Sequence, residues 1–117
     1  MRVLVVEDNA DLRDYLRLAL ESQGHEVRTA DNGRIALQYL QRDGIDVVLT
    51  DLYMPEMDGI ETTVELRRHF PTLPVIVMSG KPATHTPVME ELGAARVLKK
   101  PFALEELLDA LQELQPT

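Results

Sequence analysis

Short apolar runs alternate along this chain with segments in which apolar residues recur every three or four positions. The runs are typical of strands buried on both faces, and the recurring spacing is typical of amphipathic helices. The expected strands cover residues 2–6, 26–30, 46–50, 75–78 and 96–98. The expected helices begin after Asn9, after Asn32, at Gly59, at Pro87 and after Pro101. The pattern therefore predicts five strand-then-helix units.

The fourth helix is the irregular member of this series. Pro82 and Pro87 both lie within its segment. A proline inside a helix costs about 3 kcal/mol, because it lacks an amide donor and collides with the preceding turn. We therefore expect irregular chain as far as Thr86, then a shortened helix with Pro87 at its first position and its end at Gly93.

Alternating strands and helices with short connections predict an α/β fold, a doubly wound parallel sheet with helices on both faces. In such sheets ligands bind beyond the carboxyl ends of the strands, where the strand order reverses. Polar residues follow four of the expected strands: Glu7-Asp8, Asp51, Ser79 and Lys100. Because the carboxyl ends of parallel strands share one edge, the sequence predicts a single functional crevice there.

Asp51 ends the buried run of the third strand. Packing does not explain an acidic side chain at this place, because burying an unpaired charge is costly. If the first and third strands are neighbours, Glu7, Asp8 and Asp51 converge and repel one another unless a cation compensates. Carboxylate oxygens suit Mg²⁺. Alone, Glu7-Asp8 is better explained as a solvated loop that caps a helix; with Asp51 added, a metal site is the better interpretation.

Lys100 adds a cation to the same edge, where it can pair with Asp51 and with an anion built on it. Pro101 can hold a cis peptide bond, which costs only about 0.5–1 kcal/mol before proline. Ser79 alone is an ordinary strand-end residue, but beside a phosphate-sized anion its hydroxyl is a ligand. Aspartate is a known nucleophile, and a carboxylate held between Mg²⁺ and lysine is suited to accept a phosphoryl group.

Composition narrows the classes of protein. We expect 117 residues to form one domain, 1–117. Acidic residues outnumber basic ones by 20 to 12, and the net charge of −8 argues against direct nucleic-acid binding. No apolar run approaches the ~20 residues that span a bilayer, and we expect no signal peptide before the first strand. The lack of cysteine fits a reducing cytosol, so we expect a cytoplasmic domain without membrane contact.

Four motifs occur in order and at suitable spacing: VLVVEDN, VVLTDLYMPEMDG, VIVMSG and LKKPF. In them the sequence resembles the response-regulator receiver domains of two-component signalling, of the chemotaxis-regulator kind, over essentially the whole chain. The resemblance implies a flavodoxin-like fold of five βα units with strand order 2-1-3-4-5. It implies phosphorylation by a sensor histidine kinase or phosphotransfer protein. Without an output domain in this chain, the output is expected from a downstream protein partner or a missing effector domain.

The resemblance also assigns roles around the phosphoacceptor, which it places at Asp51. Asp8 and Asp51 are expected to ligate Mg²⁺ directly, together with the backbone carbonyl of Tyr53. Glu7 is expected to act mainly through water. The metal is therefore expected to be held by side chains from two strand ends and by one backbone group of the following loop.

Two further positions are assigned to the phosphoryl group itself. Ser79 and Lys100 are expected to contact it, with Ser79 moving toward it on activation. Family members usually carry an aromatic switch residue three positions before the motif lysine, where this chain has Val97. We therefore expect a signal carried by loop movement around the fourth helix more than by rotation of a ring.

Three other functions make different demands on the sequence. A phosphohydrolase with an aspartyl intermediate wants a second carboxylate two residues after the nucleophile, where this chain has Tyr53. A flavodoxin-like cofactor binder wants a Gly/Ser/Thr-rich phosphate loop after the first strand, where this chain has Glu7-Asp8-Asn9. A degenerate receiver that acts as a scaffold without phosphorylation is the main alternative. We do not expect an enzyme in the usual sense, although the domain is expected to assist its own phosphorylation and dephosphorylation.

Overall fold

The computed structural model describes residues 1–52 and 59–115, with the side chains of residues 82–85 left aside. The strands are β1 (Arg2–Val6), β2 (Glu26–Ala30), β3 (Val47–Asp51), β4 (Val75–Ser79) and β5 (Arg96–Lys99). The helices are α1 (Ala10–Ser22), α2 (Gly33–Arg42), α3 (Gly59–His69), α4 (Pro82–Glu91) and α5 (Leu104–Leu114). None of these helices is long and apolar enough to cross a membrane.

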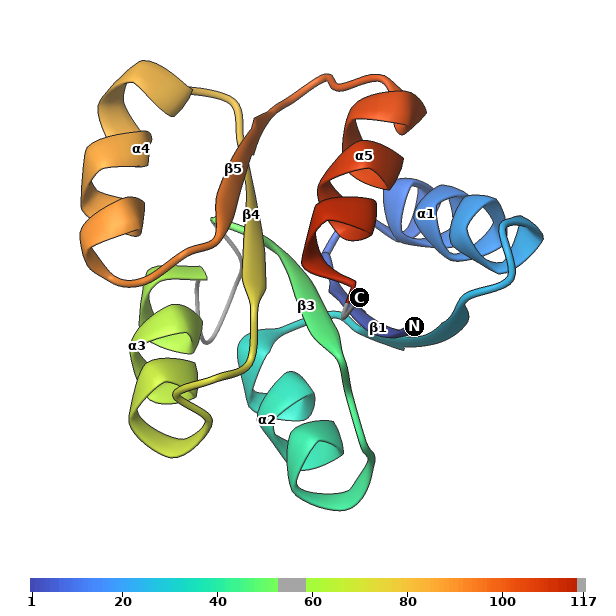
Figure 1. Cartoon of the computed structure of the whole chain (residues 1–117), viewed down its shortest axis with the longest axis horizontal. Helices are drawn as coiled ribbons and strands as arrows, with labels where there is room; N and C mark the ends of the chain where they lie inside the picture. Colours follow the sequence, from blue (N-terminus) through green and yellow to red (C-terminus); the bar gives the residue numbers. More distant parts are fainter. Residues whose placement is uncertain (53–58, 116–117) are drawn as a thin grey trace.

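The five strands form one parallel sheet in the order β2-β1-β3-β4-β5, as expected (Figure 1). The order reverses between β1 and β3, because the chain adds β2 on one side of β1 and all later strands on the other. In the register, Val6 pairs with Thr50, and Asp51 pairs with Met78. The carboxyl ends of β1, β3 and β4 are therefore level, and the residues that follow them share one edge.

Helices cover both faces of the sheet, and each face has its own apolar cluster (Figure 1). Alternate residues along a strand point to opposite faces. Val5 and Leu49 accordingly pack with α1 and α5, whereas Val6 and Val48 pack with α2, α3 and α4. The central strands are buried on both sides, which explains their unbroken apolar runs.

Two asparagines start helices as predicted. The side chain of Asn9 accepts a hydrogen bond from the amide of Leu12 at 3.0 Å, and that of Asn32 accepts from the amide of Ile35 at 3.0 Å. Both side chains satisfy an amide that has no partner in the first turn. Because the Asn9 cap follows the Glu7-Asp8 pair directly, it fixes the direction in which the chain leaves the edge of the sheet.

The fourth helix differs from the one predicted from the sequence. α4 begins at Pro82, so neither the irregular chain as far as Thr86 nor the start at Pro87 is right. Its ten residues equal the ten of α2, so α4 is not shortened relative to that helix. Pro82 takes the first position, where no amide donor is needed, and Pro87 lies inside. Packing of the fully buried Met89 on the sheet offsets the hydrogen bond that Pro87 removes.

Candidate functional site

A lysine joins the ends of three strands. The Nζ atom of Lys100 lies 2.7 Å from Oε1 of Glu7 and 3.2 Å from Oδ1 of Asp51. Glu7 follows β1, Asp51 is the last residue of β3, and Lys100 follows β5. The side chain of Lys100 therefore crosses the end of β4 to reach both carboxylates. The predicted contact with Asp51 is present, and the shorter contact with Glu7 is one that sequence reasoning did not find.

Glu7 is the buried member of this group, with 1% of its surface exposed. Burial raises the pKa of the Glu7 carboxyl, and the hydrogen bonds from Lys100 and from the amide of Asn9 only partly offset it. Burial by itself lowers the pKa of Lys100, but the hydrogen bond to Glu7 and the charge of Asp51 outweigh it and raise that pKa. Lys100 is thus held in its charged form between the two carboxylates.

Three carboxylates meet at this edge. Glu7, Asp8 and Asp51 each offer one oxygen, and these atoms all lie within 4.8 Å of one another. Asp8 is exposed, so the group is open to water on one side. One lysine does not neutralise three carboxylates, and hard oxygen donors around an open side fit Mg²⁺ with part of its water shell. Tyr53, whose carbonyl was assigned to the metal, lies outside the described residues.

Ser79 ends β4 at the same edge. It is buried, one position beyond the partner of Asp51, and its hydroxyl accepts a hydrogen bond from the amide of Lys81 at 3.0 Å. The carbonyl of Ser79 accepts from the amide of Lys100 at 2.8 Å. These contacts tie the end of β4 to the residue after β5, so Ser79 and Lys100 are placed by the same strand pair.

The remaining assigned positions lie on or next to β5. The Lys100-Pro101 peptide bond is cis, as expected. Lys99 is exposed, as strand alternation predicts, so only Lys100 is turned to the carboxylates. Val97 pairs with Val77 and is partly buried against the cluster under α2, α3 and α4. A short aliphatic side chain thus occupies the position for which the resemblance implies an aromatic ring.

Two residues that support Glu7 were not assigned to the site from the sequence. Asn9, predicted only as a helix cap, also donates its amide to Oε2 of Glu7 at 3.1 Å. Arg13 donates from Nη1 to the carbonyl of Glu7 at 2.9 Å. The position of Arg13, one helical turn after the cap, is the signal that points to this contact, because a side chain there lies over the start of the helix.

The chain matches the model of the family described as the response regulator receiver domain over residues 3–112. A probable transcriptional regulatory protein of Picosynechococcus sp. is 40% identical over 115 residues, which cover 92% of this chain and 46% of that protein. The response regulator receiver protein CpdR of Brucella abortus is 37% identical, over 97% of this chain and 95% of that protein. The chain spans about half the length of the first curated relatives it matches.

Solved structures agree with the family match. The response regulator TrrA of Thermotoga maritima, in complex with Mg²⁺-BeF, superposes with a TM-score of 0.89 at 28% identity, over 97% of this chain and 98% of that one. The chemotaxis response regulator CheY4 of Vibrio cholerae gives a TM-score of 0.88 at 32% identity, with the same coverage. The chain belongs to the response regulator receiver domain family, the signalling domain of two-component systems.

Proposed function

We propose that this domain accepts a phosphoryl group on Asp51 in a Mg²⁺-dependent reaction and that phosphorylation changes its surface for a protein partner. The observation that supports the proposal most directly is Lys100 held between Glu7 and Asp51, with Asp8 beside them. A cation and a metal-ligand set around one strand-end carboxylate are what phosphoryl transfer to that carboxylate needs. The complex of TrrA with Mg²⁺-BeF supports the same use of this fold.

The metal fits the donor set of this edge. Asp8 and Asp51 would hold Mg²⁺ directly with the carbonyl of Tyr53, and Glu7 would act mainly through water. When bound, Mg²⁺ supplies positive charge that offsets the charge developing on the transferring oxygens. Glu7 fits the indirect role, because its two carboxylate oxygens already accept from Lys100 and from the amide of Asn9.

The side chains of the site act on the transfer in distinct ways. The amide of Leu52 donates to Oδ1 of Asp51 at 2.9 Å, and together with Lys100 it orients the carboxylate. An oxygen of Asp51 forms the new bond to phosphorus while the bond from phosphorus to the donor breaks. Lys100 then pairs with the phosphoryl oxygens, and Ser79 turns its hydroxyl from the amide of Lys81 toward them.

Phosphorylation of Asp51 would require a phosphodonor and a means of output. The phosphodonor is a sensor histidine kinase or a phosphotransfer protein, whose phosphorylated histidine delivers the group to Asp51. The output is carried by a separate protein or by an effector domain. The lengths of the relatives leave room for either arrangement: the Picosynechococcus regulator is about twice as long as this chain, and CpdR is nearly equal to it in length.

Labelling with acetyl phosphate tests the proposal. The native protein is expected to gain one phosphoryl group by intact mass in the presence of Mg²⁺ and none in the presence of EDTA, because the metal is needed to offset the developing charge. Asp51→Asn is expected to gain none. Asp46→Asn is the matched control and is expected to be labelled like the native protein. Asp46 is an exposed carboxylate that directly precedes the first residue of β3, whereas Asp51 is the last residue of that strand. Labelling of Asp51→Asn, or a native protein that binds Mg²⁺ without gaining the group, would contradict the proposal.

A further inference from the structure

Arg67 binds the turn at the end of the sheet that is opposite to Asp51. It lies in the last turn of α3, and its guanidinium donates to two carbonyls of the segment between α3 and β4. Nη1 donates to the carbonyl of Pro71 at 3.0 Å, and Nη2 donates to that of Leu73. Arg67 therefore fixes the path of the chain from α3 into β4, the strand that carries Ser79.

The stem of the same side chain lies against the end of α4. Gly93 follows that helix with a φ of +91°, and a Cβ built there would lie 2.8 Å from Cδ of Arg67. Such a contact is closer than side chains tolerate. The stem of Arg67 can therefore pack against the backbone at position 93 in this way only because that residue is glycine. The cation also lies beside the carboxyl ends of α3 and α4, where the helix dipoles favour positive charge.

Arg67 does this while part of it is buried without a partner. The Nε atom of Arg67 is buried and has no hydrogen-bond partner within residues 1–52 and 59–115. Burial lowers the pKa of Arg67, but a guanidinium remains charged in proteins. The adjacent Arg68 differs, with 72% of its side chain exposed and an ion pair to Glu65 at 3.7 Å. The two arginines thus offer a buried position and an exposed control in one helical turn.

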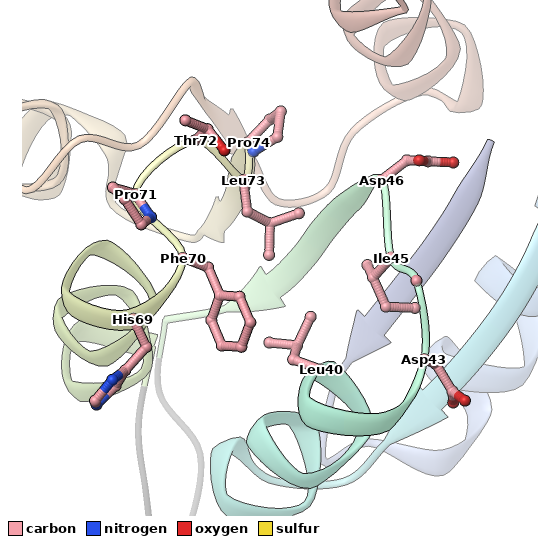
Figure 2. A pocket seen from close by; sticks show the side chains of 11 residues that line it. Leu40, Asp43, Ile45, Asp46, His69, Phe70, Pro71, Thr72, Leu73 and Pro74 are labelled. Carbon is pink, nitrogen blue, oxygen red and sulfur yellow. The ribbon is translucent and has the colours of Figure 1, made fainter.

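The turn also packs through Phe70 and Leu73 against the apolar cluster under α2, α3 and α4. The side chains of Phe70 and Leu73 point into a hollow of about 530 Å³, toward Leu40 of α2 and Ile45 of the segment between α2 and β3 (Figure 2). The carbonyls of the turn are bound by Arg67, and its apolar side chains face this hollow. The end of α3, the turn, the start of β4 and the end of α4 are therefore joined as one unit around Arg67.

The other ends of both helices lie at the functional edge. α4 begins at Pro82, three residues after Ser79, and α3 begins at Gly59, eight residues after Asp51. We propose that Arg67 is a positioning residue that fixes the carboxyl end of α4, so that phosphorylation tilts this helix about Gly93. A ten-residue helix is about 15 Å long, so a displacement of its first turn tilts the helix when its last turn is held. This inference rests on the proposed function of Asp51.

Backbone amide shifts with and without Mg²⁺ and beryllofluoride, a tetrahedral analogue of the phosphoryl group, test the inference. In the native protein we expect changes at Gly80, Lys81 and Thr86 that are at least threefold larger than those at Leu92 and Gly93. In Arg67→Met we expect the ratio to fall toward one, because the end of α4 is no longer held. Arg68→Met, the control, should keep the native ratio.

A milder variant covers the case in which Arg67→Met does not fold. Arg67→Lys keeps the charge and the stem but cannot span two carbonyls, so it is expected to lower the ratio in the same direction. A native ratio near one, or an Arg67→Lys or Arg67→Met ratio equal to the native one, overturns the inference. If the amides of Leu52 and Lys100 also fail to respond to the analogue, the proposed function fails as well; if they respond, only the role of Arg67 is refuted.

Discussion

Lys100→Met is expected to lower the free energy of unfolding at neutral pH by about 3 kcal/mol, measured in denaturant with EDTA present. Removing one partner of a buried ion pair costs about 3–5 kcal/mol, because the other charge stays buried without compensation. The lower end applies, since a quarter of the Lys100 side chain is exposed (25%) while Glu7 is buried (1%). The variant is also expected to slow phosphorylation of Asp51, which loses the cation at 3.2 Å.

The pH dependence of this loss has a definite sign. Burial holds the pKa of Glu7 above its ordinary 4.5 in the folded protein, and removing Lys100 raises it further. Protonation of Glu7 therefore favours the folded form, so the deficit of Lys100→Met is full above the folded pKa and shrinks as the pH falls through it. Lys99→Met, an exposed neighbour, should cost little at any pH. A deficit that is equal at pH 7 and pH 4 would contradict the assigned role of Glu7.

Asp8→Asn is expected to weaken Mg²⁺ binding by about tenfold or more, which is 1.4 kcal/mol or more of binding free energy. Asp8 offers an oxygen within 4.8 Å of those of Glu7 and Asp51, and it is the exposed carboxylate of the three. The free energy of unfolding without metal should rise slightly, because the repulsion of Asp8 with the other two carboxylates is relieved. Isothermal titration with Mg²⁺ measures the effect.

Asp11→Asn is the matched control for the metal experiment. Asp11 is also exposed and acidic and lies in the first turn of α1, but it is not part of the carboxylate group. It should bind Mg²⁺ as the native protein does. Equal affinities of the native protein and Asp8→Asn would exclude Asp8 as a ligand and move the metal site away from this edge.

Much of the fold could be predicted because the decisive signals are local. Unbroken apolar runs identify strands that are covered on both faces, and Asn9 and Asn32 mark two helix starts by a hydrogen bond within one turn. The strand order came from the family resemblance and is confirmed. Convergence of Glu7, Asp8 and Asp51 then follows, because the strands they end or follow are neighbours with level ends.

The features that were missed depend on contacts between distant parts of the chain. Local propensity placed the start of α4 at Pro87, but burial of Met89 stabilises a helix that begins at Pro82. Glu7 and Lys100 are 93 residues apart, and no local sequence pattern around either residue predicts their contact at 2.7 Å. In the sequence, Arg67 is one of several charged residues in a helical segment. Its contact with Gly93 is visible only in the folded structure.

The proposed acceptor of the phosphoryl group is a carboxylate oxygen of Asp51. Borohydride reduces an acyl phosphate to an alcohol, so a phosphorylated aspartate becomes homoserine, which peptide mass spectrometry can place in the sequence. After treatment with acetyl phosphate, Mg²⁺ and borohydride, we predict homoserine at position 51 and at no other aspartate, with none formed in EDTA. Homoserine at Asp8 in place of Asp51, or an unmodified chain despite Mg²⁺ binding, would contradict the account.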